Sequence, residues 1–225
     1  ANYYLDSEDL KAMRSTYFWL GILYNDGAGT KKDINKGAKL IERAADYGHI
    51  DAASRTALNY FVGHGIEKNM SKYVQYLYIS TKGGKVDDYH RLAKANLNGT
   101  GTEINYEEAF KWFKKSAEHD YNNNYLIPKS YISLALMYNF GIGIQQDFDL
   151  AFKWFKLSAE RGNKDAFVDL AYAYGAGEGT KKNMKLSFKW YKKAADEKIH
   201  EAYYPLAYLY ANGEGTKKDE KKPKK

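Results

Sequence analysis

Histidine is the side chain here best suited to metal binding or acid–base catalysis, because the chain has no cysteine. The five histidines are His49, His64, His90, His119 and His200. No two of them stand four residues apart, and the His-Glu-x-x-His motif of helical zinc sites is absent. Carboxylates are abundant but unpaired outside expected solvated helix faces, and no Gly-x-Ser-x-Gly nucleophile motif occurs. We therefore expect no catalytic residue, no metal site, no cofactor and no enzymatic activity.

A Gly-x-Gly-Thr-Lys-Lys motif occurs three times, at residues 27–32, 177–182 and 213–218, and it invites a phosphate-binding interpretation. The motif lacks the glycine spacing of dinucleotide-binding and P-loop sequences. Each copy also follows a predicted helix rather than a strand. We interpret the motif as a structural turn.

Composition and charge narrow the classes of protein to consider. The 225 residues are 44% hydrophobic and 28% charged, which is typical of a folded protein. No apolar run reaches the ~20 residues of a membrane span. The net charge is +7, but residues 217–225 hold six Lys against one Asp and one Glu, which is +4 of that total. Nucleic-acid binding through this tail is therefore a minor alternative, and a protein partner is favoured. The chain begins at Ala1, which suggests a processed or trimmed start.

The dominant feature of the sequence is an internal repeat. Gly-x-Gly pairs recur with steps of 36, 36, 42, 36 and 36 residues, and an Asp or Asn follows each pair at a fixed offset. The first glycines are Gly27, Gly63, Gly99, Gly141, Gly177 and Gly213. The Asp and Asn residues are Asp33, Asn69, Asn105, Asp147, Asn183 and Asp219. Glycine tolerates positive φ and Asx suits a helix N-cap, so the markers predict a turn between two helices.

Apolar residues on both sides of these turns recur at helical spacing. The first helix in repeats one, four, five and six carries aromatic-x-x-Leu-small-x-x-Tyr, and the small residue predicts close approach of a neighbouring helix. In repeat three, Asn96 replaces the Tyr. In the second helices we expect Trp112, Trp154 and Trp190 to be core residues. Helices are predicted at 8–25, 33–47, 50–62, 69–82, 86–98, 105–119, 128–140, 147–161, 164–176, 183–198 and 200–212. The six-residue insertion falls in 120–127, with Pro128 at a helix start.

The pattern resembles the Sel-1-like repeat family, which is related to tetratricopeptide repeats. Residues 20–29, Leu-Gly-Ile-Leu-Tyr-Asn-Asp-Gly-Ala-Gly, match its first-helix motif, and residues 183–195 match its second. Repeat two departs from the pattern at Ala53, Thr56 and Tyr73. The resemblance implies an all-α right-handed superhelical solenoid of about five and a half repeats over residues 1–216. The repeats would lie near 8–48, 49–84, 85–120, 121–162, 163–198 and 199–216, followed by a disordered tail at 217–225.

The resemblance further implies a non-catalytic adaptor that binds a protein in a concave groove formed by the first helices. By analogy with tetratricopeptide repeats, the partner-binding residues would be Phe18, Asn25, Phe61, His90, Lys94, Asn139, Phe140, Tyr172, Tyr204 and Tyr208. Some bacterial relatives are exported immunity proteins that neutralise a cognate toxin. A toxin is therefore one candidate partner, and an exported or periplasmic location is favoured. An enzyme acting on cell-wall or β-lactam-like substrates is the alternative, and the chain would be a monomer or a dimer through its open last repeat.

Overall fold

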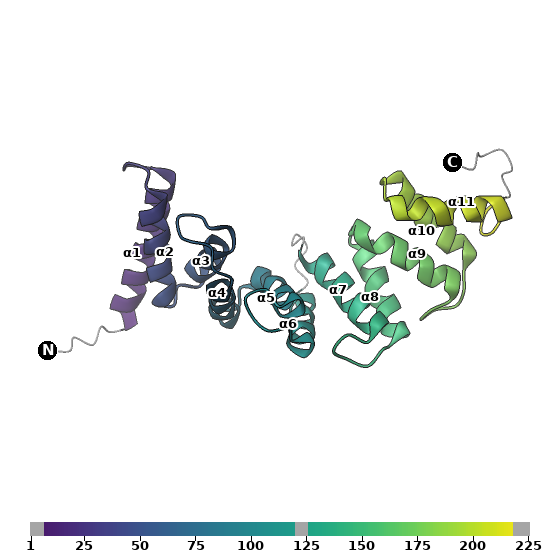
Figure 1. Cartoon of the computed structure of the whole chain (residues 1–225), viewed down its shortest axis with the longest axis horizontal. Helices are drawn as coiled ribbons and strands as arrows, with labels where there is room; N and C mark the ends of the chain where they lie inside the picture. Colours follow the sequence, from purple (N-terminus) through teal and green to yellow (C-terminus); the bar gives the residue numbers. More distant parts are fainter. Residues whose placement is uncertain (1–6, 120–125, 218–225) are drawn as a thin grey trace. The chain divides into compact units, whose positions relative to one another are not determined.

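The computed structural model describes residues 7–119 and 126–217, which form eleven α-helices, two short 3₁₀ helices and no strand (Figure 1). The predicted all-α repeat of helix pairs is confirmed. The helices are α1 (Ser7–Asp26), α2 (Ile34–Asp46), α3 (Ile50–Val62), α4 (Met70–Lys82), α5 (Val86–Asn98), α6 (Tyr106–Glu118), α7 (Leu126–Phe140), α8 (Phe148–Glu160), α9 (Phe167–Ala176), α10 (Met184–Asp196) and α11 (Tyr203–Asn212). The 3₁₀ helices η1 (Lys164–Ala166) and η2 (His200–Ala202) lead into α9 and α11.

The helix bounds agree with the predictions to within two residues when the 3₁₀ turns are included. Pro128 lies in the first turn of α7, where its missing N–H removes no helical hydrogen bond. Most of the predicted insertion lies outside the described residues, and its last two residues, Leu126 and Ile127, already belong to α7. Residues 218–225, which include Asp219 and nearly all of the predicted tail, also lie outside.

The turn between the paired helices is built by the predicted markers. Gly27 takes a φ of +74°, and both glycines of every described pair have positive φ. The Asp33 carboxylate accepts from the Lys36 amide at 2.9 Å, and its own amide donates to the Tyr24 carbonyl at 2.9 Å. Asn69, Asn105, Asp147 and Asn183 make the same pair of contacts. The Gly-x-Gly-Thr-Lys-Lys motif therefore contributes glycines to a helix–helix turn.

The chain divides into two compact units, residues 1–112 and 113–225, with the boundary inside α6. Each unit has its own buried core. One core includes Ile41, Leu77 and Leu92, and the other includes Phe167 and Leu170. The prediction that residues 1–216 form a single solenoid stays a prediction.

Small residues set the approach of paired helices, as the repeat pattern indicates. At Gly21 in α1, an added Cβ would lie 2.6 Å from the Ile41 Cγ1 and 2.8 Å from the Gly37 carbonyl oxygen. In α9 the same register position is the fully buried Ala171. The first pair of helices is thus packed around glycine where later pairs have alanine.

Repeat two exchanges large and small residues across its helix pair. Tyr73 of α4 replaces the usual small residue, and Ala53 and Thr56 of α3 replace the usual aromatic residue and leucine. All three side chains are buried, and the Tyr73 ring packs on Phe61 of α3 with ring centroids 5.0 Å apart.

The tryptophans of the second helices pack on the aromatic residue of the first helix in their own repeat. Ring centroids of Tyr131 and Trp154, and those of Phe167 and Trp190, are both 5.4 Å apart. Trp112 lies 5.6 Å from Tyr89. These distances are typical of aromatic pairs in protein cores.

Candidate binding surfaces

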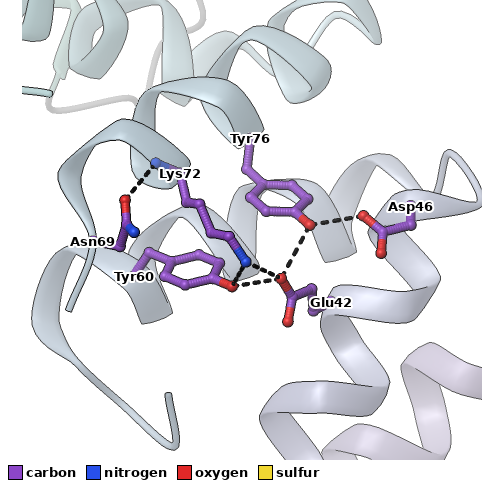
Figure 2. A network of polar contacts seen from close by, with 6 residues as sticks. All are labelled: Glu42, Asp46, Tyr60, Asn69, Lys72 and Tyr76. Atoms are coloured by element: carbon purple, nitrogen blue, oxygen red, sulfur yellow. Dashed lines mark hydrogen bonds and ion pairs between the residues drawn. The ribbon is translucent and has the colours of Figure 1, made fainter. Parts of the chain in front are cut away.

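A polar cluster links α2, α3 and α4 (Figure 2). The Tyr60 hydroxyl donates to Glu42 Oε1 at 2.5 Å and accepts from Lys72 Nζ at 2.6 Å. Lys72 Nζ also lies 3.3 Å from Glu42 Oε1. The Tyr76 hydroxyl donates to Asp46 Oδ1 at 2.7 Å and lies 3.2 Å from Glu42 Oε1. A pocket of about 690 Å³ adjoins the cluster at Glu42, Tyr60 and Lys72.

The protonation states of this cluster do not favour catalysis. Burial, followed by the hydrogen bond to Glu42, raises the pKa of Tyr60, and burial also raises the pKa of Tyr76. The hydrogen bond with Tyr60 raises the pKa of Lys72. At neutral pH the phenols keep their protons and the ammonium keeps its charge, whereas a general base or an amine nucleophile needs a pKa near neutrality. We interpret the cluster as a structural link between two repeats.

The surface predicted to bind a partner is the first-helix face, which we define as the outer surface of α1, α3 and α5 in one unit and of α7, α9 and α11 in the other. Eight of the ten predicted residues have exposed or half-buried side chains: Phe18, Phe61, Lys94, Asn139, Phe140, Tyr172, Tyr204 and Tyr208. Asn25 and His90 are buried, each with 5% exposed. That any of the ten contacts a partner stays a prediction.

The burial of Asn25 and His90 has a local cause in each case. Asn25 lies over Gly37, where a Cβ would come within 2.1 Å of the Asn25 Oδ1. His90 lies in the α3/α5 socket, a pocket of about 280 Å³ in which Phe61 and Tyr73 pack with ring centroids 5.0 Å apart. The other residues that line the α3/α5 socket are Leu58, Arg91, Lys94, Ala95, Asn98 and Thr100. Two of these, Arg91 and Lys94, are cationic.

A second socket occupies the same register in the other unit. The α9/α11 socket has a volume of about 400 Å³ and brings three predicted residues together, Tyr172, Tyr204 and Tyr208. Its further lining residues are Gly175, Ala176, Met184, Ser187, Tyr191, Pro205 and Leu209. None of these lining residues carries a formal charge at neutral pH, and the three tyrosines are 54%, 81% and 52% exposed.

Seven of the nine residues that line the α3/α5 socket have a counterpart 114 residues later in the lining of the α9/α11 socket. Gly175 replaces Phe61, and Ser187 replaces Tyr73. Two rings that line the α3/α5 socket therefore have no counterpart in the α9/α11 socket. Tyr208 likewise replaces Lys94, so an aromatic rim stands where the first socket has a cation.

A narrow cleft of about 30 Å³ lies between α7 and α9 and shares Tyr172 with the α9/α11 socket. This α7/α9 cleft is lined by Asn139, another predicted residue, and by the carboxylates of Asp169 and Glu178. Burial raises the pKa of the half-buried Asp169 carboxyl. The Tyr172 hydroxyl lies 3.4 Å from Glu178 Oε1.

Sequence reasoning missed Gly175, Ser187, Tyr191 and Asp169. Burial first, and then the nearby Tyr172 and Asp169, raise the pKa of Tyr191 to about 12. The Asp169 carboxylate therefore influences Tyr191, which lines the α9/α11 socket. A comparison of equivalent repeat positions contains the missing signal, because a glycine and a serine there replace two aromatic residues of repeat two.

Within residues 7–119 and 126–217, no three His, Asp or Glu side chains are grouped to hold a metal ion, and no helix is long and apolar enough to cross a membrane.

Comparison with protein families decides the relationship that the repeat suggests. The Sel1 repeat model matches residues 15–49, 50–84, 86–121, 128–163, 168–198 and 200–222. The chain belongs to the Sel1 repeat family. Sel1 repeats mediate protein–protein interactions and generally act as non-catalytic scaffolds, so a protein partner is the expected ligand class.

Solved Sel1 repeat structures resemble this chain over almost its whole length. A protective antigen of uropathogenic Escherichia coli matches with a TM-score of 0.78 and 26% identity over 96% of this chain. The chain spans only 46% of that protein. A Sel1 repeat protein from Oxalobacter formigenes matches with a TM-score of 0.72 and 26% identity over 98% of this chain and 84% of its own. An immunity protein from Pseudomonas aeruginosa reaches a TM-score of only 0.43 at 17% identity, which carries no functional argument.

Proposed function

We propose that this Sel1 repeat chain is a non-catalytic scaffold that binds a protein partner on the first-helix face of residues 113–225. The observation that carries the proposal is the group of exposed tyrosines around the apolar α9/α11 socket. Exposed aromatic side chains at the rim of an apolar pocket are typical of the energetic centres of protein interfaces. Tyrosine also loses little conformational entropy on binding for the area that it buries.

The arrangement of the tyrosines supports a binding role over a purely structural one. Tyr172, Tyr204 and Tyr208 each leave about half or more of the side chain exposed, whereas Tyr174 and Tyr191 in the same unit are buried. The buried tyrosines already supply the aromatic packing that the repeat requires. The exposed tyrosines bury apolar area only when another molecule covers them.

Affinity capture tests the proposal, with the full chain as bait in an extract of the source organism at moderate salt. We expect one stoichiometric protein to be retained by the native chain and lost by a Tyr172→Ala/Tyr208→Ala variant. Each substitution removes interface contacts worth about 1–2 kcal/mol, so together they weaken binding by at least about tenfold. A toxin as the retained protein would identify an immunity protein.

The matched control is Lys189→Ala/Lys192→Ala, which changes two exposed residues of α10. This variant should retain the partner as the native chain does, and all three proteins should show equal helicity by circular dichroism. Equal retention by the tyrosine variant would contradict the proposal. Retention that depends on the lysines and is lost as salt rises would instead indicate binding to an anionic surface or nucleic acid.

A further inference from the structure

The α9/α11 socket and the α7/α9 cleft together show which partner chemistry they fit. We propose that they bind a protein segment with one large apolar or aromatic side chain, held in the α9/α11 socket, beside a Lys or Arg whose charge pairs with Asp169. This inference rests on the proposed function and names the chemistry of the partner. Its evidence consists of the volume and lining of the socket, the unpaired state of two polar groups and the distribution of charge.

The socket fits a single large side chain. Its volume of about 400 Å³ lies within the range of roughly 300–1,000 Å³ for ligand pockets, and its lining is tyrosine, methionine, proline, leucine and small residues. An aromatic or long aliphatic side chain would bury its area against Tyr172, Tyr204 and Tyr208 without losing any hydrogen bond. The socket therefore favours an apolar anchor.

The hydroxyl of Ser187, at the floor of the socket, lacks a hydrogen-bond partner among the described residues. The Ser187 side chain is 1% exposed, and its Oγ has no hydrogen-bond partner in the described structure. A Cβ added at Gly175 would lie 2.9 Å from this oxygen, so the hydroxyl lies directly below the glycine that opens the socket. An unsatisfied buried hydroxyl costs about 1–3 kcal/mol, which a donor or acceptor on the anchor, such as an indole N–H, would recover.

The Asp169 carboxylate favours a partner segment that carries a cationic side chain. This carboxylate makes no hydrogen bond or ion pair within residues 7–119 and 126–217, and it shares the α7/α9 cleft with a second carboxylate, Glu178. No Lys or Arg lines the cleft or the α9/α11 socket. A half-buried carboxylate without a counter-ion is destabilising, and a partner cation placed beside it gains both Coulomb attraction and hydrogen bonds.

Tyr172 connects the two parts of the proposed site. It lines the α9/α11 socket and the α7/α9 cleft, and its hydroxyl lies 3.4 Å from Glu178 Oε1. The equivalent α3/α5 socket provides the contrast, because Arg91 and Lys94 line it and Arg91 already pairs with Asp88. A cationic segment is therefore attracted to the first-helix face of one unit and repelled at the equivalent socket of the other.

A library of random short peptides, displayed on phage and selected on the full chain, provides the probe. We expect enriched sequences to combine Trp, Phe, Tyr, Leu or Met with a Lys or Arg close by. The tightest peptide is then synthesised with its cation intact and with Gln in its place. Fluorescence anisotropy measures both peptides against the native chain, Asp169→Asn and Tyr172→Ala/Tyr208→Ala.

A double-mutant cycle isolates the predicted pair. Asp169→Asn should lower the affinity for the cationic peptide by about fivefold and change the affinity for the Gln peptide by less than about twofold, as expected for a half-buried charge pair. The control Asp149→Asn removes the same charge from an exposed position on α8 and should change neither. The tyrosine variant should weaken both peptides.

The outcomes separate this inference from the proposed function. Selection of peptides that need the tyrosines but contain no Lys or Arg would overturn this inference and leave the proposed function standing. So would an equal effect of Asp169→Asn on the binding of the cationic peptide and of its Gln version. Enrichment of acidic sequences would also overturn it. Selection of no peptide that depends on the tyrosines would overturn both the inference and the proposed function.

Discussion

The α3/α5 and α9/α11 sockets stand at the same place in the repeat but differ in chemistry. In the first, the paired rings of Phe61 and Tyr73 and two cationic residues form part of the lining. In the second, Gly175 and Ser187 leave the interior open and tyrosines form the rim. The sockets share turns and register, although 3₁₀ turns open α9 and α11 where α3 and α5 are α-helical from the start. Their difference in chemistry lies in side chains at equivalent positions.

This contrast separates the residues that build the repeat from those that specify a surface. Turn glycines and Asx caps are the same in both units, because positive φ and unsatisfied helix N–H groups demand them wherever the turn occurs. Positions 61 and 175 belong to no turn and to no cap. Each faces the second helix of its own pair, where Phe61 packs on Tyr73 and Gly175 lies next to Ser187. A repeat scaffold can therefore vary its binding chemistry without changing its fold.

The largest expected effect concerns helix approach in the first pair, where glycine replaces the alanine of the other unit. Gly21→Ala places a Cβ against Ile41 Cγ1 and the Gly37 carbonyl, and should lower the free energy of unfolding by about 2 kcal/mol. Chemical denaturation monitored by circular dichroism measures this loss. Gly84→Ala is the control, because position 84 has open space and only an unfavourable φ of +82°, so it should cost about 1 kcal/mol. Equal losses would contradict a close approach at Gly21.

A second substitution converts the open socket toward the filled one. Gly175→Phe introduces at α9 the residue that α3 has at position 61, and should weaken peptide or partner binding by at least about tenfold. Phenylalanine has a higher helix propensity than glycine, but its Cβ would lie 2.9 Å from the Ser187 Oγ, so the binding comparison requires equal helicity by circular dichroism. Ala211→Phe makes the equivalent change on α11, at an exposed residue outside the socket lining, and should leave binding within about twofold. Undiminished binding by Gly175→Phe would show that the socket is not the site.

The charge contrast predicts a pH-dependent stability effect at Asp169. Burial raises the pKa of its folded carboxyl above the unfolded value, so stability falls as pH rises between those two values, and the loss persists above the folded pKa. The titratable groups around it are Tyr172 and Glu178 beside it and Tyr191 on α10. Asp169→Asn should therefore stabilise the free chain by about 0.5 kcal/mol at neutral pH, and this gain should vanish below the unfolded carboxyl pKa. Denaturation of both proteins across that pH range checks the sign, and destabilisation at neutral pH would contradict it.

The smallest effect concerns the ends of the second helices. Gly48, Gly84 and Gly162 have positive φ just after α2, α4 and α8, but Lys198 takes a φ of +63° after α10. A left-handed conformation is unfavourable for lysine, so Lys198→Gly should stabilise the chain by about 0.5 kcal/mol after the entropy of glycine is counted. Gly162→Lys should destabilise it by a similar amount. Thermal unfolding of the two variants would disprove this account if both shifted in the same direction.

The fold was predictable because its determinants are local in sequence. The Gly-x-Gly pairs and Asx caps located the described turns within the helix pairs, and the periodic small residues indicated the contact between paired helices. The binding surface was predictable only in part. Asn25 is buried because Gly37 on another helix leaves it room, and His90 is buried in a socket that Phe61 and Tyr73 also line. Both depend on neighbours rather than on the residue itself. Asp169 was missed because its significance lies in the absence of a nearby cation, which spacing along the chain does not show.

Hydrogen–deuterium exchange of the full chain, with and without the captured partner or the tightest selected peptide, tests the central claim most directly. The account predicts new protection in α9 and α11, at residues 167–176 and 203–212, with the helices of residues 1–112 unchanged. Protection confined to the outer surface of α10, or to the α3/α5 socket, would contradict a binding site on the first-helix face of residues 113–225.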